Sequence, residues 1–331
     1  MKRIICQLLI FCALPIPFII LIDLFFRNQD SLYSVKYEGA FKSKDSIEII
    51  ILGNSHANFG VNPTAFSLYT YNLANVNQSI YFDKRIMLHL LDSTPKLKYV
   101  LLSVDYHSLY FSTQGIRDNW SYYGNGIKYK NQSYLLANIS PFLFGYTPKI
   151  GFALMKKKVR NYYTYGSNCL QFDVEEGVNL QDTLKKGFIT SEGNNKDAFS
   201  NESMQARADY FTEMIRQSDE KAAVIYDLEN LIKTLQEKNI NVILFSSPTY
   251  AGYNNFLDPS IADQNTKDIR TLCDKYNLQY WDFITEPLFV QHDFYNADHL
   301  NKTGAHKFSM MLNDSINKIE ARSQGIGLAG N

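Results

Sequence analysis

The chain has 331 residues with a hydrophobic content of 45%, enough for one large domain or two modest ones with a packed core. Its 33 basic and 33 acidic residues give a formal net charge of zero, and no basic stripe is present, so a nucleic-acid partner is not expected. None of the four cysteines has the spacing to histidine that metal ligands show, and no metal or other cofactor is expected.

The N-terminal residues differ in character from the rest. Lys2 and Arg3 precede an apolar run, 4–26, whose one formal charge is Asp23. A helix of this length could span a hydrocarbon core about 30 Å thick. Basic residues before such a helix are typical of a cytoplasmic N-terminus. We therefore predict an uncleaved signal-anchor helix over 1–27, with the remaining chain outside the cytoplasm; a cleaved leader is the alternative.

Strand and helix patterns alternate after a polar stretch, 28–46, that is predicted to be a linker. The predicted strands are 47–52, 69–73, 99–104, 242–245 and 278–283. The predicted helices are a short one opened by Asn62 and Pro63, then 80–91, 204–237 as one or two helices, 261–276 and 303–319. This alternation favours an α/β domain over 47–321, with a parallel sheet of about five strands covered on both faces.

Residues 111–201 interrupt this rhythm. They are rich in Tyr, Asn, Gly and Lys and show no clean periodicity. Because they connect the third and fourth strands, we predict a cap-like insertion over the site described below.

The glycine-rich end, 322–331, is predicted to be a loose tail. Export would permit a disulfide between Cys169 and Cys273, and the sequence leaves this open.

Polar residues follow the carboxyl ends of the predicted strands, which meet at one rim of a parallel sheet. Ser55 follows the first strand, Asp105 and His107 follow the third, and His299 follows the fifth after a longer loop. A serine at a strand-to-helix turn can act as a nucleophile if a base is within reach, and a loop histidine can be that base. The sequence therefore predicts a serine-dependent acyl-group site at this rim.

Three segments resemble, in order, characteristic blocks of the SGNH/GDSL hydrolase superfamily. Residues 53–56 resemble the first block, whose serine is the nucleophile. Residues 71–79 resemble the second, whose glycine supplies an oxyanion amide, and 294–305 resemble the last, which holds the catalytic histidine. The resemblance implies a three-layer, flavodoxin-like α/β/α sandwich with Ser55 and His299 as the catalytic pair.

The resemblance extends to biological setting, because anchored members occur in bacterial envelope and surface-polysaccharide pathways. Such relatives remove or transfer acyl groups, often acetyl, on glycans. The resemblance thus implies an acylated glycan substrate, a membrane acyltransferase as a potential partner, and a single-pass protein of the bacterial inner or cytoplasmic membrane. A non-catalytic, membrane-tethered scaffold or glycan-binding protein with the same fold is the alternative.

The chain departs from the family pattern at three places. Asn77 stands where the second block has glycine, although asparagine tolerates left-handed backbone and its amide could join that of Ser55 as an oxyanion donor. The third-block glycine and asparagine are absent. Asn296 stands where the family has aspartate, so Asn296, Asp298 or Asp293 could orient the imidazole, or the site could work as a dyad.

A rival arrangement starts from Asp105, Tyr106 and His107, which resemble the Asp-x-His element of alginate-type O-acetyltransferases. The serine of that element comes later in the chain, so Ser246 or Ser247 would be the nucleophile. Independently of this arrangement, the alternative for Ser55 is an ordinary turn whose serine caps a helix.

Overall fold

The computed structural model describes residues 2–27, 32–112 and 185–323, together with residues 122, 127, 156, 159, 160, 163 and 325. The chain divides into two compact units. The first consists of Met1–Val35 and Gly115–Val178, and the second of Lys36–Gln114 and Asn179–Asn331. The second unit contains the sheet and the candidate site.

The N-terminal apolar run forms two helices, α1 (Lys2–Ala13) and α2 (Ile16–Arg27), so the prediction of one continuous helix was wrong. Pro15 explains the break, because proline has no amide hydrogen and disfavours helical backbone at the preceding residue, Leu14. Each helix has 12 residues. Among the described residues, no helix combines the length and the apolar character needed to cross a membrane.

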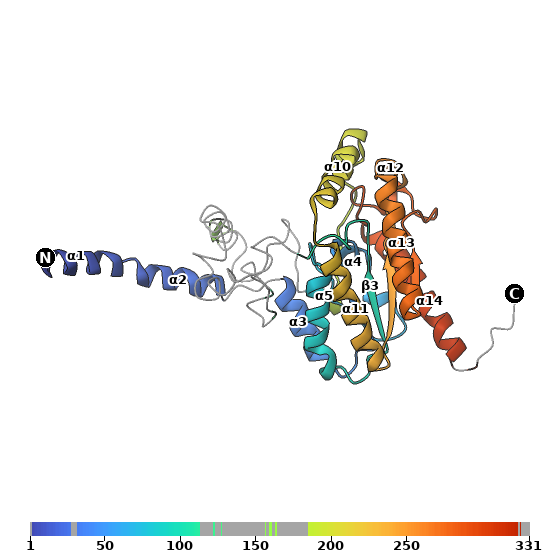
Figure 1. Ribbon diagram of the computed structural model, residues 1–331, viewed down its shortest axis with the longest axis horizontal. Helices are drawn as coiled ribbons and strands as arrows, with labels where there is room; N and C mark the ends of the chain where they lie inside the picture. The colour runs from blue at the N-terminus through green and yellow to red at the C-terminus, as the bar shows by residue number, and fades with distance from the viewer. Residues whose placement is uncertain are drawn as a thin grey trace. The chain divides into compact units, whose positions relative to one another are not determined.

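Five parallel strands form the sheet, in the order β2-β1-β3-β4-β5 (Figure 1). They are β1 (Ile49–Leu52), β2 (Thr70–Asn72), β3 (Tyr99–Ser103), β4 (Asn241–Ser246) and β5 (Gln279–Asp282). All five predicted strands are present, which confirms the α/β prediction. Every residue of β1 and β3 is buried, as expected for strands covered on both faces. This order places β1 and β3 side by side at the point where the winding direction reverses, and ligands of such sheets bind there.

Further helices follow α1 and α2 in the described part of the chain. They are α3 (Leu32–Ser43), α4 (Ser55–Gly60), α5 (Ile80–Leu90), α10 (Asn201–Gln217), α11 (Lys221–Glu237), α12 (Ala251–Asn254), α13 (Pro259–Tyr276) and α14 (Lys302–Ser323). Short 3-10 turns are η1 (Pro63–Ala65), η2 (Leu91–Ser93), η5 (Lys185–Gly187), η6 (Lys196–Phe199) and η7 (Gln291–Asp293).

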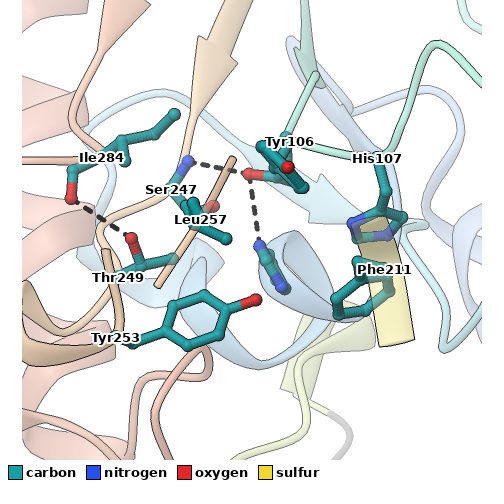
Figure 2. A pocket seen from close by; sticks show the side chains of 10 residues that line it. Tyr106, His107, Phe211, Ser247, Thr249, Tyr253, Leu257 and Ile284 are labelled. Carbon is teal, nitrogen blue, oxygen red and sulfur yellow. Dashed lines mark hydrogen bonds and ion pairs between the residues drawn. The ribbon is translucent and has the colours of Figure 1, made fainter. Parts of the chain in front are cut away.

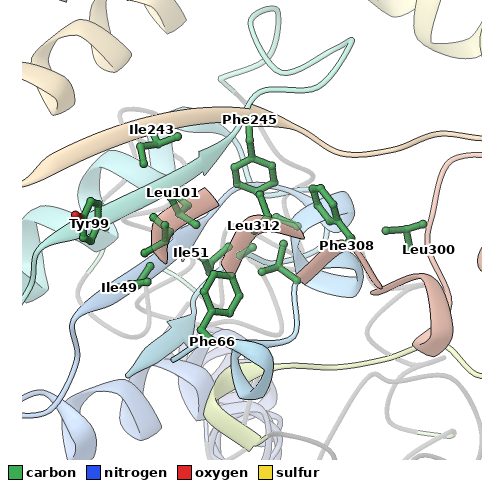
Figure 3. Packing of buried hydrophobic residues seen from close by; sticks show 14 of the residues in the cluster. Ile49, Ile51, Phe66, Tyr99, Leu101, Ile243, Phe245, Leu300, Phe308 and Leu312 are labelled. Atoms are coloured by element: carbon green, nitrogen blue, oxygen red, sulfur yellow. The ribbon is translucent and has the colours of Figure 1, made fainter. Parts of the chain in front are cut away.

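The main hydrophobic core lies between one face of the sheet and α14. Phe308 and Leu312 of this helix belong to one buried cluster with Ile51, Leu101 and Phe245 from the three central strands (Figure 3). These strand residues share a face because side chains alternate along a strand. On the other face, α5 packs against α11, which also contacts β4, and α13 lies against β5 (Figure 1). The sheet is therefore covered on both sides.

Part of the expected linker forms a helix instead. In α3, Lys36 lies in line with the buried Ala40 and is itself 1% exposed. Its ammonium group donates to Asn58 Oδ1 and to the carbonyl oxygen of Ala74, each at 2.5 Å. Burial lowers the pKa of Lys36 well below its usual value. The helix is thereby tied to α4 and to the turn after β2.

The predicted insertion over 111–201 falls mostly outside the described residues, as do Cys169 and most of the tail. The described end of the insertion lies beside the loop that carries His299. Asn194 Nδ2 donates to the carbonyl of Phe294 at 3.0 Å, and Asn301 Nδ2 donates to that of Gly193 at 2.9 Å. Cys273 is a buried free thiol.

Candidate functional site

The turn after β1 presents Ser55 at the start of α4. Gly53 has a φ of +130°, and a Cβ atom there would lie 2.6 Å from Ser103 Cβ, so the turn needs glycine. Asn54 then caps the helix, because its Oδ1 accepts the amide of His56 at 2.9 Å. These constraints fix where the Ser55 hydroxyl lies.

The loop before α14 presents His299. Asn296 Oδ1 accepts the backbone amides of Asp298 and His299, at 3.2 and 2.9 Å. The amide of Tyr295 donates to the carbonyl of His299 at 2.9 Å. One asparagine side chain therefore holds a tight turn in which the imidazole projects from a backbone with few remaining degrees of freedom.

The two predicted catalytic residues are in contact. His299 Nε2 lies 2.8 Å from Ser55 Oγ, and His299 Nδ1 lies 3.0 Å from Asn296 Oδ1 and 3.1 Å from Asp298 Oδ1. Both groups facing Nδ1 are oxygen acceptors, so Nδ1 carries the proton of the neutral ring. The lone pair of Nε2 then faces the serine hydroxyl, which is the geometry that a general base requires.

Asp298 is a buried carboxylate with three cationic or hydrogen-bonding neighbours. Its Oδ2 accepts Arg207 Nε at 3.0 Å and Nη2 at 2.8 Å, and lies 3.5 Å from His56 Nε2. Burial alone would raise the pKa of Asp298, but His299, His56 and Arg207 hold it well below its usual value. The carboxylate beside His299 Nδ1 is therefore ionised at neutral pH.

His56 lies between two carboxylates and is 5% exposed. Its Nδ1 lies 3.3 Å from Asp105 Oδ1, opposite the contact of Nε2 with Asp298. Burial lowers the pKa of His56, but the two carboxylates more than reverse this and raise it to about 10. Burial likewise disfavours the charge of Asp105, yet His56 and hydrogen bonds from Ser103 and Ser247 lower its pKa to about 2.

The other predicted rim residue, His107, does not pair with Asp105. Its Nε2 lies 3.3 Å from Asn54 Nδ2, and its ring stacks on Phe211 with centroids 4.4 Å apart. Since Asn54 Oδ1 already accepts the amide of His56, the atom facing His107 is a donor, and Nε2 accepts. Burial, with the nearby charge of His56, lowers the pKa of His107 to about 3, so the ring is neutral.

The serines of the rival arrangement are placed differently from Ser55. Ser246 Oγ donates to the carbonyl of Val104 at 2.6 Å, and Ser247 uses its backbone amide to bind Asp105 at 3.0 Å. The Ser247 hydroxyl is buried with no hydrogen-bond partner among the described residues. Within that part of the chain, neither hydroxyl is bonded to a histidine.

The two turns that hold the expected oxyanion donors are joined. Asn77 has a φ of +56°, the left-handed conformation anticipated for a residue in the glycine position. The amide of Asn75 donates to the carbonyl of Gly53 at 3.1 Å. Asp83 Oδ1 accepts the amide of Gly53 at 2.9 Å and Gln78 Nε2 at 2.6 Å. A buried carboxyl group therefore bridges both turns.

A small cavity adjoins the site (Figure 2). Its lining residues are His56, Asp105, Tyr106, His107, Phe211, Ser247, Thr249, Tyr253, Leu257 and Ile284. The cavity has a volume of about 20 Å³, room for about one water molecule. It is therefore too small for a sugar ring.

His56, Asp298 and His299 bring possible metal-ligand atoms within 4.8 Å of one another. The candidate ligand atoms of Asp298 and His299, however, already have hydrogen-bond partners. Asp298 Oδ2 binds Arg207, and His299 Nε2 binds Ser55. A metal cation would also lie against the charged Arg207 and His56, so the donor set suits the observed network better than a metal.

Comparison with known proteins identifies no family: no family model matches the chain, and no curated protein matches its sequence.

Arg207 was not predicted from the sequence, although a signal exists. It lies in α10 three residues after Met204 and four before Phe211, both of which are buried. A charged residue within an apolar helical stripe marks a position that needs a buried partner. That partner is Asp298.

The buried carboxyl group of Asp83 should make the stability of the protein depend on pH. Burial raises the pKa of Asp83 to about 7, against hydrogen bonds from Gln78 and Gly53. The folded state then binds more protons than the unfolded state between about pH 4 and 7, so this group makes the free energy of unfolding fall as the pH rises through that window. Asp83→Asn keeps an acceptor and should remove the decline in urea titrations at pH 4 to 8. A variant whose profile is parallel to the wild-type profile would contradict the assignment.

Proposed function

We propose that the chain is a serine-dependent esterase or acyltransferase of the SGNH type, acting on acyl groups, foremost acetyl, of a cell-envelope or surface polysaccharide. The observation that carries the proposal is the 2.8 Å contact between Ser55 Oγ and His299 Nε2, with two oxygens behind His299 Nδ1. The glycan substrate is proposed from the sequence resemblance alone.

In the first half of the proposed reaction, Ser55 Oγ attacks the carbonyl carbon of the acyl ester while His299 Nε2 takes the hydroxyl proton. The amides of Ser55 and Asn77 are the proposed donors to the oxyanion. The bond between the carbonyl carbon and the sugar oxygen then breaks, and Nε2 returns the proton to that oxygen. The products are a free sugar hydroxyl and an acyl-serine.

In the second half, water or an acceptor hydroxyl attacks the acyl-serine and gives its proton to His299, which passes it to Ser55 Oγ. Water makes the protein an esterase, and a sugar hydroxyl makes it a transferase. Both outcomes use the same residues. Asp298 supports both because its ionised carboxylate stabilises the imidazolium that forms in each half.

A non-catalytic scaffold is the second candidate. It is favoured by the region that should hold the third-block oxyanion asparagine. Asp105 and His107 stand there instead, and they bind His56 and the side chain of Asn54. In a scaffold, the Ser55 and His299 contact would persist without turnover, so a covalent probe separates the two candidates.

Ser55→Ala and His299→Ala should each reduce turnover of a small acetyl ester by at least about 100-fold, because general-base catalysis is typically worth about 100- to 10,000-fold. The double variant should lose little more, since the two residues act as a unit. A fluorophosphonate probe should label the wild type and not Ser55→Ala. Ser247→Ala tests the rival nucleophile and should still be labelled. Labelling that depends on Ser247 would reject Ser55, and no labelling of the wild type would favour the scaffold.

The residue that orients the His299 ring can be identified by moving the carboxylate from position 298 to position 296. Asp298→Asn keeps an acceptor beside His299 Nδ1 but removes the charge, and we expect a loss of about 100- to 10,000-fold in kcat. Adding Asn296→Asp in that background places a carboxylate 3.0 Å from the same nitrogen and should restore part of the loss. Full activity in Asp298→Asn would show that Asn296 alone suffices.

The location of the site domain outside the cytoplasm, tethered by the N-terminal segment, is also proposed, on the basic residues that precede the apolar run. Reporters fused after Ser323 should be active when they require an exported environment and inactive when they require the cytoplasm. The reverse pattern would reject export.

A further inference from the structure

His56 occupies an unusual electrostatic position. Each of its two ring nitrogens faces a different carboxylate, with Nδ1 at 3.3 Å from Asp105 and Nε2 at 3.5 Å from Asp298. A neutral imidazole has one N–H and could donate to only one of them. Asp298 also binds Arg207, whereas the only ion pair of Asp105 among the described residues is the one with His56. Because Asp105 is 2% exposed, leaving it without a cationic partner would be costly, and a neutral ring that donates to Asp105 would turn a nitrogen lone pair toward the Asp298 carboxylate. This geometry favours the doubly protonated ring.

The charges around His56 sum to zero. The titratable and charged groups that face it come from three segments: Asp105 and His107 after β3, Asp298 and His299 before α14, and Arg207 of α10, which reaches it through Asp298. The rings of His107 and His299 have their centroids 5.7 and 5.0 Å from that of His56. With His107 neutral, two carboxylates balance one imidazolium and one guanidinium.

We infer that His56 is a permanent imidazolium which, with Asp105 as its counter-ion, keeps the Asp298 carboxylate ionised and in place behind His299. His56 and Asp105 are thus positioning residues, and this role rests on the acyl chemistry proposed for Ser55 and His299. Asp105 is itself fixed by Ser103 Oγ at 2.6 Å and by the amide of Ser247 at 3.0 Å. The ends of β3 and β4 thereby set the position of Asp298 through His56.

The first test needs no substrate. In the intact protein with ¹⁵N-labelled histidine, the His56 ring is identified by the signals lost in His56→Gln. It should stay doubly protonated between pH 6 and 9, because the carboxylates raise its pKa to about 10. Its contribution to stability should be present below about pH 6.5 and lost as the pH rises toward 10. A neutral His56 ring at pH 8 overturns the inference.

A double-variant cycle tests the counter-ion. His56→Gln leaves the cluster with one excess negative charge and Asp105→Asn leaves it with one excess positive charge, whereas the double variant is neutral again. Each single variant should lower the thermal midpoint by about 5–10 °C, and the double variant should lower it by clearly less than the sum. His107→Gln combined with Asp105→Asn is the matched control, and it should be additive because His107 is uncharged. Additive effects for His56 and Asp105 overturn the inference.

The pH profile of kcat/KM for an acetyl ester tests whether the charge of His56, balanced by Asp105, affects the proposed reaction. His56→Gln removes a positive charge, which favours the protonated forms of the groups that remain. The acidic limb should therefore move to higher pH by about one unit, and His107→Gln should leave it in place. Equal shifts in both variants would indicate lost packing and reject the role of charge. If no ester is turned over, the proposed function fails, while the NMR and stability tests still decide the charge state of His56.

Discussion

The candidate site depends on one buried carboxylate, that of Asp298. It lies against the proposed base His299, and it is the point where Arg207 and His56 converge. An isolated carboxylate at this depth would take up a proton and lose its ability to stabilise an imidazolium. His299, His56 and Arg207 prevent this, and His56 is itself cationic because it lies between Asp298 and a second carboxylate, Asp105. The charged groups that act on the Ser55–His299 pair therefore include residues at the carboxyl ends of both β1 and β3.

Under the proposed SGNH-type function, an aspartate would be expected at position 296, where the chain has asparagine. Asn296 Oδ1 holds the loop amides and contacts His299 Nδ1. The charge is supplied instead by Asp298, one residue before the histidine. A side chain this close in sequence reaches Nδ1 from a different direction, and its other oxygen is left to face the protein interior. Arg207 and His56 bind that second oxygen, so the displaced carboxylate needs the additional cations.

Much of the fold was predictable because the central strands are short and mostly apolar, as β1 with three isoleucines and a leucine shows. The rim location of Ser55, Asp105, His107 and His299 followed from the parallel sheet. The contact between Ser55 and His299 was also expected. The partners of Asp105 and His107 were not, because they depend on side-chain directions at the ends of different strands. Asp105 binds His56, and His107 binds Asn54, although their adjacency suggested that they act together. The N-terminal apolar run predicts one anchor helix because membrane helices tolerate proline kinks, whereas the structure has a break between Ala13 and Ile16.

The residues that support the site share a sequence feature that an averaged hydropathy profile does not show: each is a charged residue on an otherwise apolar face of a helix. Lys36, Asp83 and Arg207 are charged residues at positions where their helices otherwise show apolar residues, and each contacts a site-bearing turn or Asp298 itself. An apolar residue at these positions would pack well but would leave a carbonyl, an amide or a carboxylate without its partner. Each of these contacts is therefore specific, because few neighbouring groups can satisfy a charged or polar side chain at such a position. Arg207 shares α10 with Met204 and Ala208, which belong to one buried cluster with Tyr253, so the packing of this helix brings the guanidinium to the carboxylate behind His299.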